Sequence, residues 1–244
     1  FNTVLYTGSG SSPNAITGVG FQPDWVWIKK RSASISHAIF DSSRGVTSAG
    51  ATNKAIGSDR ADAEGNGNGG LSAFGSDGFT LVDGSSGSYP RSLVNDSATY
   101  VAWNWLANGG TTSSNTDGSI TSTVQANTTA GFSIVTYTGD NGSSATVGHG
   151  LGTVPAMIIV KMRNGTNHWA VYHQSLGNTK SAYLSLTQAP DTNASFWNNT
   201  SPTSSVFTIG TDNIVNASNT YVAYCFAEVE GFSRFGSYIS NQST

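Results

Sequence analysis

The strongest constraint on the fold of this chain is an internal repeat. The string FNTVLYTG at 1–8 returns as FSIVTYTG at 132–139, and TYVAWNWLA at 99–107 returns as TYVAYCFAE at 220–228. Three further blocks recur in the same order: GFQPDWVWIK at 20–29 with LGTVPAMIIVK at 151–161, HAIFDSSRG at 37–45 with WAVYHQSLG at 169–177, and GFTLV at 78–82 with VFTIG at 206–210. Order and spacing both persist, so we interpret the chain as a duplicated unit of about 110–125 residues.

Each repeat has the pattern of short β-strands. Alternating or apolar runs are separated by clusters of Gly, Asn, Asp, Ser and Pro, and no block keeps a helical apolar period over several turns. We expect strands near 2–7, 24–30, 36–41, 78–82, 99–106, 119–125, 132–138, 156–162, 168–173, 181–186, 205–209, 220–228 and 232–239. The pattern predicts an all-β fold of two tandem antiparallel β-sandwich modules, at 1–110 and 119–244, joined by a linker at 111–118.

A third copy of the unit begins near the C-terminus. The string GFSRFGSYISNQS at 231–243 matches GFSIVTYTGDNGS at 131–143, with one more residue between the Phe and the Tyr. Two interpretations stay open for this last strand: it starts a further repeat, or it pairs back and closes an earlier module. Because the chain also starts within a repeat block, on Phe1, we expect a processed chain or a segment of a longer array.

The repeat also tests whether the tryptophans of PDWVWIKK (23–30) form a core or a ligand platform. The second copy reads PAMIIVK, so Trp25 and Trp27 correspond to Met157 and Ile159. Core positions accept such apolar exchanges, whereas a ring that stacks on a ligand does not. We therefore favour core or module-interface packing for both tryptophans, with a ligand platform specific to the first module as the alternative.

Composition excludes several functional classes. Charged residues make up 10% of the 244 residues, with a formal net charge of −3, so a basic face for nucleic acid is not expected. The single cysteine, Cys225, cannot form an intrachain disulfide. No apolar run is long enough for a membrane-spanning helix, and we expect no membrane insertion.

The sequence contains no recognisable catalytic motif. His37 and Asp41 would lie about 13 Å apart along a strand, too far for a Ser–His–Asp triad with Ser43. The carboxylates Asp59, Asp62 and Glu64, in a loop dense in Asn and Gly, are weak candidates for a Ca²⁺ site, and a solvated loop is the simpler interpretation. We expect no cofactor and no enzyme activity.

The repeated blocks, taken together, resemble a module of tail-fibre-like virion structural proteins of bacteriophages, especially marine ones. FNTVLYTG, ITGVGFQPDWVWIKKRS, LSAFGSDGFTL and TYVAWNWLANGG carry the resemblance, which extends over nearly the whole chain. It implies jelly-roll or concanavalin-lectin-like sandwich modules in a fibre or adhesin of the virion. The implied partners are other virion proteins, a host-surface glycan and further copies of the chain, with a trimer favoured.

Any glycan site is expected on loops that differ between the two halves. The candidate residues come from YPRSLVND at 89–96 and FWNNTSP at 196–202; they are Tyr89, Arg91, Asn95, Trp197, Asn198 and Asn199. The alternative is that Tyr89 and Trp197 anchor their own loops. Two functional alternatives also stay open: a head-decoration or fibre-shaft protein without a ligand, and a glycoside hydrolase that depolymerises host polysaccharide.

Overall fold

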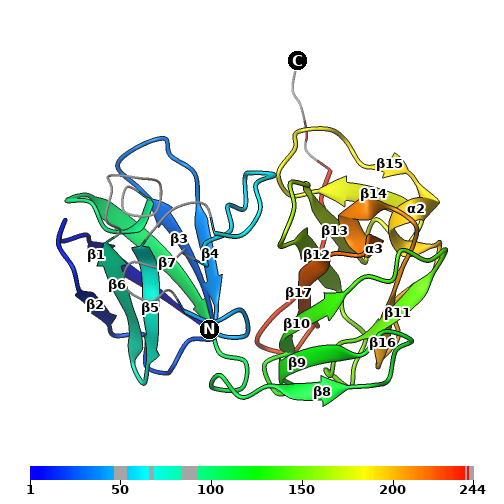
Figure 1. The fold of residues 1–244 in the computed structure, drawn as a ribbon, viewed down its shortest axis with the longest axis horizontal. Coiled ribbons are helices and arrows are strands. Elements are labelled where there is room, and N and C mark those ends of the chain that lie inside the picture. The colour runs from blue at the N-terminus through cyan, green and yellow to red at the C-terminus, as the bar shows by residue number, and fades with distance from the viewer. Residues whose placement is uncertain (47–53, 66–68, 84–92, 240, 242–244) are drawn as a thin grey trace.

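The computed structural model describes residues 1–46, 54–65, 69–83, 93–239 and 241, and it is nearly all β. The chain forms two halves that lie side by side, the first drawn in blue to teal and the second in green to orange (Figure 1). Each half contains two antiparallel sheets whose apolar faces enclose a core. The predicted all-β sandwich fold is therefore confirmed.

The first half pairs a four-stranded sheet, in the order β1-β7-β3-β4, with a three-stranded sheet, in the order β2-β6-β5. The bounds are β1 Asn2–Thr7, β2 Asn14–Thr17, β3 Trp25–Lys30, β4 Ala38–Asp41, β5 Gly69–Gly75, β6 Gly78–Asp83 and β7 Thr99–Trp105. Residues such as Val26, Ile28, Phe40 and Tyr100 point between the two sheets and form the first core.

The second half pairs an eight-stranded sheet, in the order β15-β14-β13-β12-β17-β10-β9-β8, with the two-stranded sheet β11-β16. The bounds are β8 Ser113–Asn115, β9 Ser122–Asn127, β10 Phe132–Thr138, β11 Ala145–Gly148, β12 Met157–Met162, β13 Trp169–His173, β14 Lys180–Tyr183, β15 Asp191–Thr192, α2 Ala194–Trp197, β16 Val206–Ile209, α3 Asn213–Asn216 and β17 Thr220–Phe226. Both helices are single turns capped by the side chains of Asn193 and Asp212.

The same strand registers occur in both halves. Asn2 pairs with Asn104 as Ser133 pairs with Cys225, and Trp25 pairs with Trp105 as Met157 pairs with Phe226. The stacked pairs Tyr6–Tyr100 and Tyr137–Tyr221 also match, with ring centroids 5.1 and 5.0 Å apart. These registers agree with our interpretation of the sequence as a repeat.

Two segments differ from the expected organisation. The predicted linker 111–118 contains β8, which pairs with β9 and so belongs to the second half. The strand expected at 232–239 is absent from the structure; the described residues of 228–239 form only one isolated bridge, Val229–Ser233. Pairing back onto β17 is impossible because β10 and β12 already occupy both of its edges.

A third apolar cluster joins the halves. It contains Trp25, Ile39, Ile56 and Ala107 from the first half, and Phe132, Ile134, Ile159, Trp169, Val222, Tyr224 and Phe226 from the second. These second-half residues lie on the face of the eight-stranded sheet that points away from its own core. The first half covers this face, so the two sandwiches pack as one body.

Candidate aromatic groove between the two halves

An aromatic groove of about 280 Å³ lies where the outer faces of the two large sheets meet. Trp25, Trp27 and Trp105 line it from the first half, and Phe132, Met157 and Phe226 line it from the second. Phe1, Phe232 and Phe235 also border it. The alternation of strand side chains produces this arrangement, because Trp25 and Trp27 are two residues apart on β3 and Trp105 pairs directly with Trp25.

Trp25 is buried in the apolar cluster that joins the two halves. Its side chain is 1% exposed, and its ring centroid lies 4.8 Å from that of Tyr224 and 5.8 Å from that of Phe132. Module-interface packing, as favoured from the sequence, is therefore confirmed for Trp25.

Trp27 differs from Trp25 because it remains half-buried at the open side of the groove. Its indole Nε1 donates to Nδ1 of His37 at 2.9 Å, and its ring meets Trp103 edge-on at 5.8 Å. The corresponding residue of the second half, Ile159, is buried. Ile159 also lines the groove, so the two corresponding residues border the same space, and of the two only the ring of Trp27 stays partly exposed.

His37 supplies a polar group beside this ring. Burial lowers the pKa of His37, the charge of Asp59 raises it, and that of Lys29 lowers it, with a net decrease. A neutral His37 whose Nδ1 accepts from Trp27 carries its proton on Nε2, which makes Nε2 a hydrogen-bond donor. The backbone N–H of His37 donates to Oδ1 of Asp59 at 3.2 Å, so a carboxylate lies beside His37, although neither residue lines the groove.

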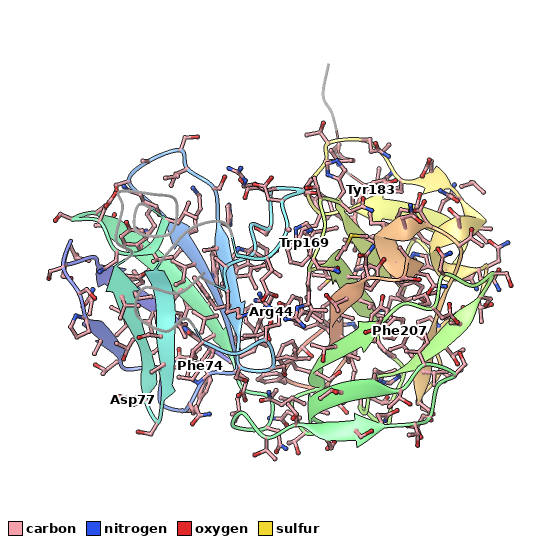
Figure 2. All side chains as sticks on the ribbon, viewed as in Figure 1. Arg44, Phe74, Asp77, Trp169, Tyr183 and Phe207 are labelled. Carbon is pink, nitrogen blue, oxygen red and sulfur yellow. The ribbon has the colours of Figure 1, made fainter. Side chains whose placement is uncertain are left out.

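A buried ion-pair network fixes the halves next to the groove. Arg44 is held by Asp41, with Nε–Oδ2 at 2.5 Å, and the hydroxyl of Tyr224 donates to the same Oδ2 at 2.6 Å. Glu64 accepts from Nε of Arg163 at 2.7 Å and lies 3.4 Å from Nη1 of Arg44. Figure 2 shows Arg44 and Trp169 between the two halves.

The basic side chains of this network keep the carboxyl group of Glu64 ionised. Burial alone would raise the pKa of Glu64, but the charge of Arg44, together with the hydrogen bond and charge of Arg163 and a hydrogen bond from Lys54, lowers it to about 2. Burial lowers the pKa of nearby Lys161 to about 8, although its Nζ donates to the carbonyls of Ala61 and Met162.

The connection between the halves is also held by a buried carboxylate. Asp24 accepts hydrogen bonds from the backbone N–H groups of Ala107, Gly109 and Gly110, at 2.7–2.8 Å. Oε1 of Gln125, on β9, accepts from the N–H of Gly110 as well, at 3.0 Å. The chain that leads from one sandwich to the other is therefore bound to both of them.

The structure corrects two of the predicted glycan contacts. Asn95 is 0% exposed; its Oδ1 accepts from Ser9 N and its Nδ2 donates to Ser11 O, as the equivalent Asn216 does for Asp140 N and Gly142 O. Asn95 therefore closes a loop within the sandwich, and its amide is not available to a ligand.

The second concerns Trp197, for which the sequence left two interpretations open: contact with a ligand, or anchoring of its own loop. It is 1% exposed in α2 and packs edge-on against Tyr172 at 5.9 Å, so it anchors its own loop. Asn198 and Asn199 follow it on the surface, both in the left-handed conformation, with φ of 48° and 50°. Tyr89 and Arg91 lie outside the described residues. Of the six candidates, Asn198 and Asn199 are therefore the ones that the structure describes on the surface.

The three weak metal candidates do not converge. Glu64 forms ion pairs with three basic side chains. Asp62 accepts from Nε of Arg60 at 2.6 Å, and Asp59 accepts from the backbone N–H of His37. In the described part of the chain, no three His, Cys, Asp or Glu side chains are grouped to hold a metal ion. Burial raises the pKa of the Cys225 thiol to about 12, which argues against a nucleophilic role.

Comparison with known proteins assigns a family to the whole chain. Residues 1–244 match the model of a domain of unknown function, DUF7483. The chain belongs to the DUF7483 family. Its model extends over both sandwiches, in agreement with the core and the ion pairs that they share. No curated protein and no solved structure shows significant similarity to the chain. No helix in the described ranges has the length and apolarity needed to span a membrane.

Sequence reasoning missed the ion-pair network, and it gave the aromatic groove only as the alternative ligand platform of Trp25 and Trp27. One signal was present: in the matching blocks at 37–45 and 169–177, Asp41 and Arg44 of the first half correspond to His173 and Leu176. Charged residues that occur in one copy only, inside an otherwise similar block, are candidates for a contact between the copies.

Proposed function

We propose that this DUF7483 protein is a structural segment of a bacteriophage tail fibre or similar appendage, and that its aromatic groove binds a host-surface glycan. The observation that carries the glycan part is the part-open ring of Trp27, whose counterpart Ile159 is buried. The resemblance of the repeated blocks to phage fibre modules supports the location in a virion.

The packing of the two sandwiches suits an appendage that transmits force. Tyr224 reaches from the second half to Asp41 of the first, and Arg163 reaches back to Glu64. Separating the halves would break these pairs and expose the cluster around Trp25. The exposure of this apolar cluster to water opposes hinge motion at the junction.

The groove offers the two kinds of contact that a sugar ring uses. The rings of Trp27 and Trp105 present apolar surface to its C–H face, and Ser233 supplies a hydroxyl in the lining. His37 lies behind Trp27, whose indole N–H it accepts, and could contribute Nε2 only beside the groove. Its volume of about 280 Å³ is at the lower end for small-molecule sites, which favours one or two sugar units of a chain rather than a long segment.

Glycan arrays and tryptophan fluorescence titrations with host capsule and lipopolysaccharide fragments test this proposal. Trp27→Leu is expected to weaken binding at least tenfold, whereas Trp27→Phe retains a ring and part of the affinity. Trp103→Leu removes a half-buried ring that contacts Trp27 but does not line the groove, so it should weaken binding less than Trp27→Leu. A double Asn198→Ala, Asn199→Ala variant tests the exposed loop predicted from the sequence.

The possible results separate the alternatives. Loss of binding in Trp27→Leu alone supports the groove, and loss in the asparagine variant alone moves the site to the loop after α2. Absence of binding to every host glycan, together with detection of the chain in purified particles by mass spectrometry, leaves the architectural role. Shortened polysaccharide after incubation would establish the depolymerase alternative.

A further inference from the structure

A serine hydroxyl, a carboxylate and a side-chain amide meet where the two sandwiches join. Ser42 directly follows β4 of the first half, and Gln125 lies on β9 of the second. Nε2 of Gln125 donates to Oγ of Ser42 at 2.9 Å, and Oε1 of the same amide lies 3.3 Å from that oxygen. Both atoms bonded to the carbonyl carbon of the amide are therefore close to the hydroxyl, which places this carbon within reach of Oγ.

The hydroxyl of Ser42 is also paired with a base. It donates to Oδ1 of Asp24 at 2.8 Å, and Asp24 is fully buried. A hydroxyl becomes a nucleophile when a group within hydrogen-bond distance can take its proton. Ser43 differs in this respect. Its Oγ also lies 2.9 Å from Nε2 of Gln125, but it donates to no carboxylate among the described residues.

The carbonyl group of Gln125 is polarised from its other side. Oε1 accepts from the backbone N–H groups of Asn108 and Gly110, at 3.2 and 3.0 Å. Because these N–H groups can bond only to the oxygen end of the amide, the contacts also fix which atom is Oε1. Two N–H groups on a carbonyl oxygen stabilise the negative charge that develops there when the carbon is attacked.

We propose that Oγ of Ser42 attacks the side-chain carbonyl carbon of Gln125 and forms an ester that cross-links the two sandwiches. Asp24 takes the proton of the hydroxyl, and a C–O bond forms. The C–N bond of the amide then breaks, and the proton passes from Asp24 to the departing nitrogen, which leaves as ammonia. No oxidant or further reactant takes part. The reaction occurs once in each chain, so it is a self-modification without turnover.

The surroundings favour formation and persistence of the ester. An ester is less stable than an amide, but ammonia escapes into water and is protonated there, which draws the reaction forward. Ser42 is half-buried, so solvent reaches the side from which ammonia leaves. Gln125 is 0% exposed, and its carbonyl is therefore shielded from hydrolysis.

The second copy of the repeat lacks these groups. Asp24 and Ser42 correspond to Ala156 and Gln174 in the matching blocks, so neither the base nor the nucleophile is repeated. The first half carries them on the side that faces Gln125 of the second half. A covalent bond at this position would hold the two sandwiches together independently of the ion pairs and independently of glycan binding.

Intact-mass spectrometry of the denatured full chain tests the proposal. The wild type is expected to be lighter than its sequence by the mass of one ammonia, and a peptide map should contain a branched peptide that joins Ser42 to Gln125. Mild alkali should open the link and leave a carboxylic acid at position 125. A succinimide at an Asn–Gly pair, such as Asn108–Gly109, loses the same mass but leaves the peptides linear.

Variants identify the reacting groups. Ser42→Ala and Gln125→Glu should have the masses of their sequences, since the first lacks the nucleophile and the second lacks the nitrogen that leaves as ammonia. Ser43→Ala is the matched control and should still lose ammonia. Asp24→Asn should form the link at least about a hundredfold more slowly, in line with the usual contribution of a general base.

The central measurement is made on the wild type and does not depend on the folding of any variant. A wild-type mass equal to that of the sequence, or a loss of ammonia with only linear peptides, would overturn the proposal. A branch at Ser43, or a link that persists in Ser42→Ala, would overturn the assignment of Ser42 as the nucleophile and the proposal with it.

Discussion

Replacement of Glu64 by Gln probes the contact between the sandwiches through its pH dependence. The carboxylate of Glu64 accepts from Nε of Arg163 at 2.7 Å and lies 3.1 Å from Nζ of Lys54 and 3.4 Å from Nη1 of Arg44. Gln keeps the shape of the side chain and removes its charge. The variant should therefore lose the ion pairs while the backbone around residue 64 stays in place.

The magnitude follows from the pKa. Glu64 has a pKa of about 2 in the folded protein, against about 4.3 in an unfolded chain, and each unit corresponds to about 1.4 kcal/mol. The charged form thus contributes at most about 3 kcal/mol, and about 2 kcal/mol is expected once screening of the partly exposed Lys54 is considered. Because the folded pKa is the lower one, this contribution is complete above about pH 4.3 and is lost as the pH falls toward 2.

Urea denaturation followed by tryptophan fluorescence, at a series of pH values, measures the effect. Glu64→Gln should be about 2 kcal/mol less stable than the wild type at neutral pH, with the difference shrinking toward zero near pH 2. Asp62→Asn is the matched control in the same loop, since the Arg60–Asp62 pair is exposed to 40% and 33%. Its effect should stay below about 1 kcal/mol.

Two results would refute the reasoning. Equal stability of Glu64→Gln and the wild type at neutral pH would mean that the network does not stabilise the junction. A constant difference at all pH values would mean that the loss comes from altered packing and not from the carboxylate charge.

Three further predictions concern packing and burial. Trp25→Ala should lower the free energy of unfolding by about 3–5 kcal/mol in urea titrations, because the ring fills the junction between the halves. From about pH 8 to pH 10, the wild type should gain stability and Lys161→Met should not, since the unfolded lysine keeps its proton while the folded one, with a pKa of about 8, releases it. Gly8→Ala and Gly139→Ala should each lower the melting temperature by a similar amount, because a Cβ would lie 2.1 Å from Asp96 O and 2.2 Å from Ala217 O, respectively.

Most strands were predictable because their signal is local. The alternating runs at 2–7, 99–105 and 132–138 become strands within a residue or two of the expected bounds. The short strands β8 and β15 were missed because two or three residues show no period. The seven-residue β5, Gly69–Gly75, was also missed; it begins with two glycines and ends with a third. The run at 232–239 has a strand pattern, but in the described structure it contributes only to the isolated bridge Val229–Ser233.

The candidate site was less predictable, because the surface or interior position of a loop residue depends on distant contacts. Asn95 and Trp197 have the polar or turn-like neighbours of exposed residues, yet both are buried. The amide of Asn95 forms its hydrogen bonds with the backbone of Ser9 and Ser11 and not with water. The ring of Trp197 belongs to the second core. Neither contact leaves a trace in the local sequence.

The sequence by itself determined the β architecture and the equivalence of the two halves, since the alternation of side chains depends on neighbours along the chain. Only the tertiary structure decided how the halves meet. Trp25 and Trp27 are alike in sequence, but one is covered by Tyr224 and Phe132 and the other stays part-open. Asp41 meets Tyr224 across 183 residues of chain. Such contacts arise from packing two formed sheets, and no local pattern encodes the surface on which they meet.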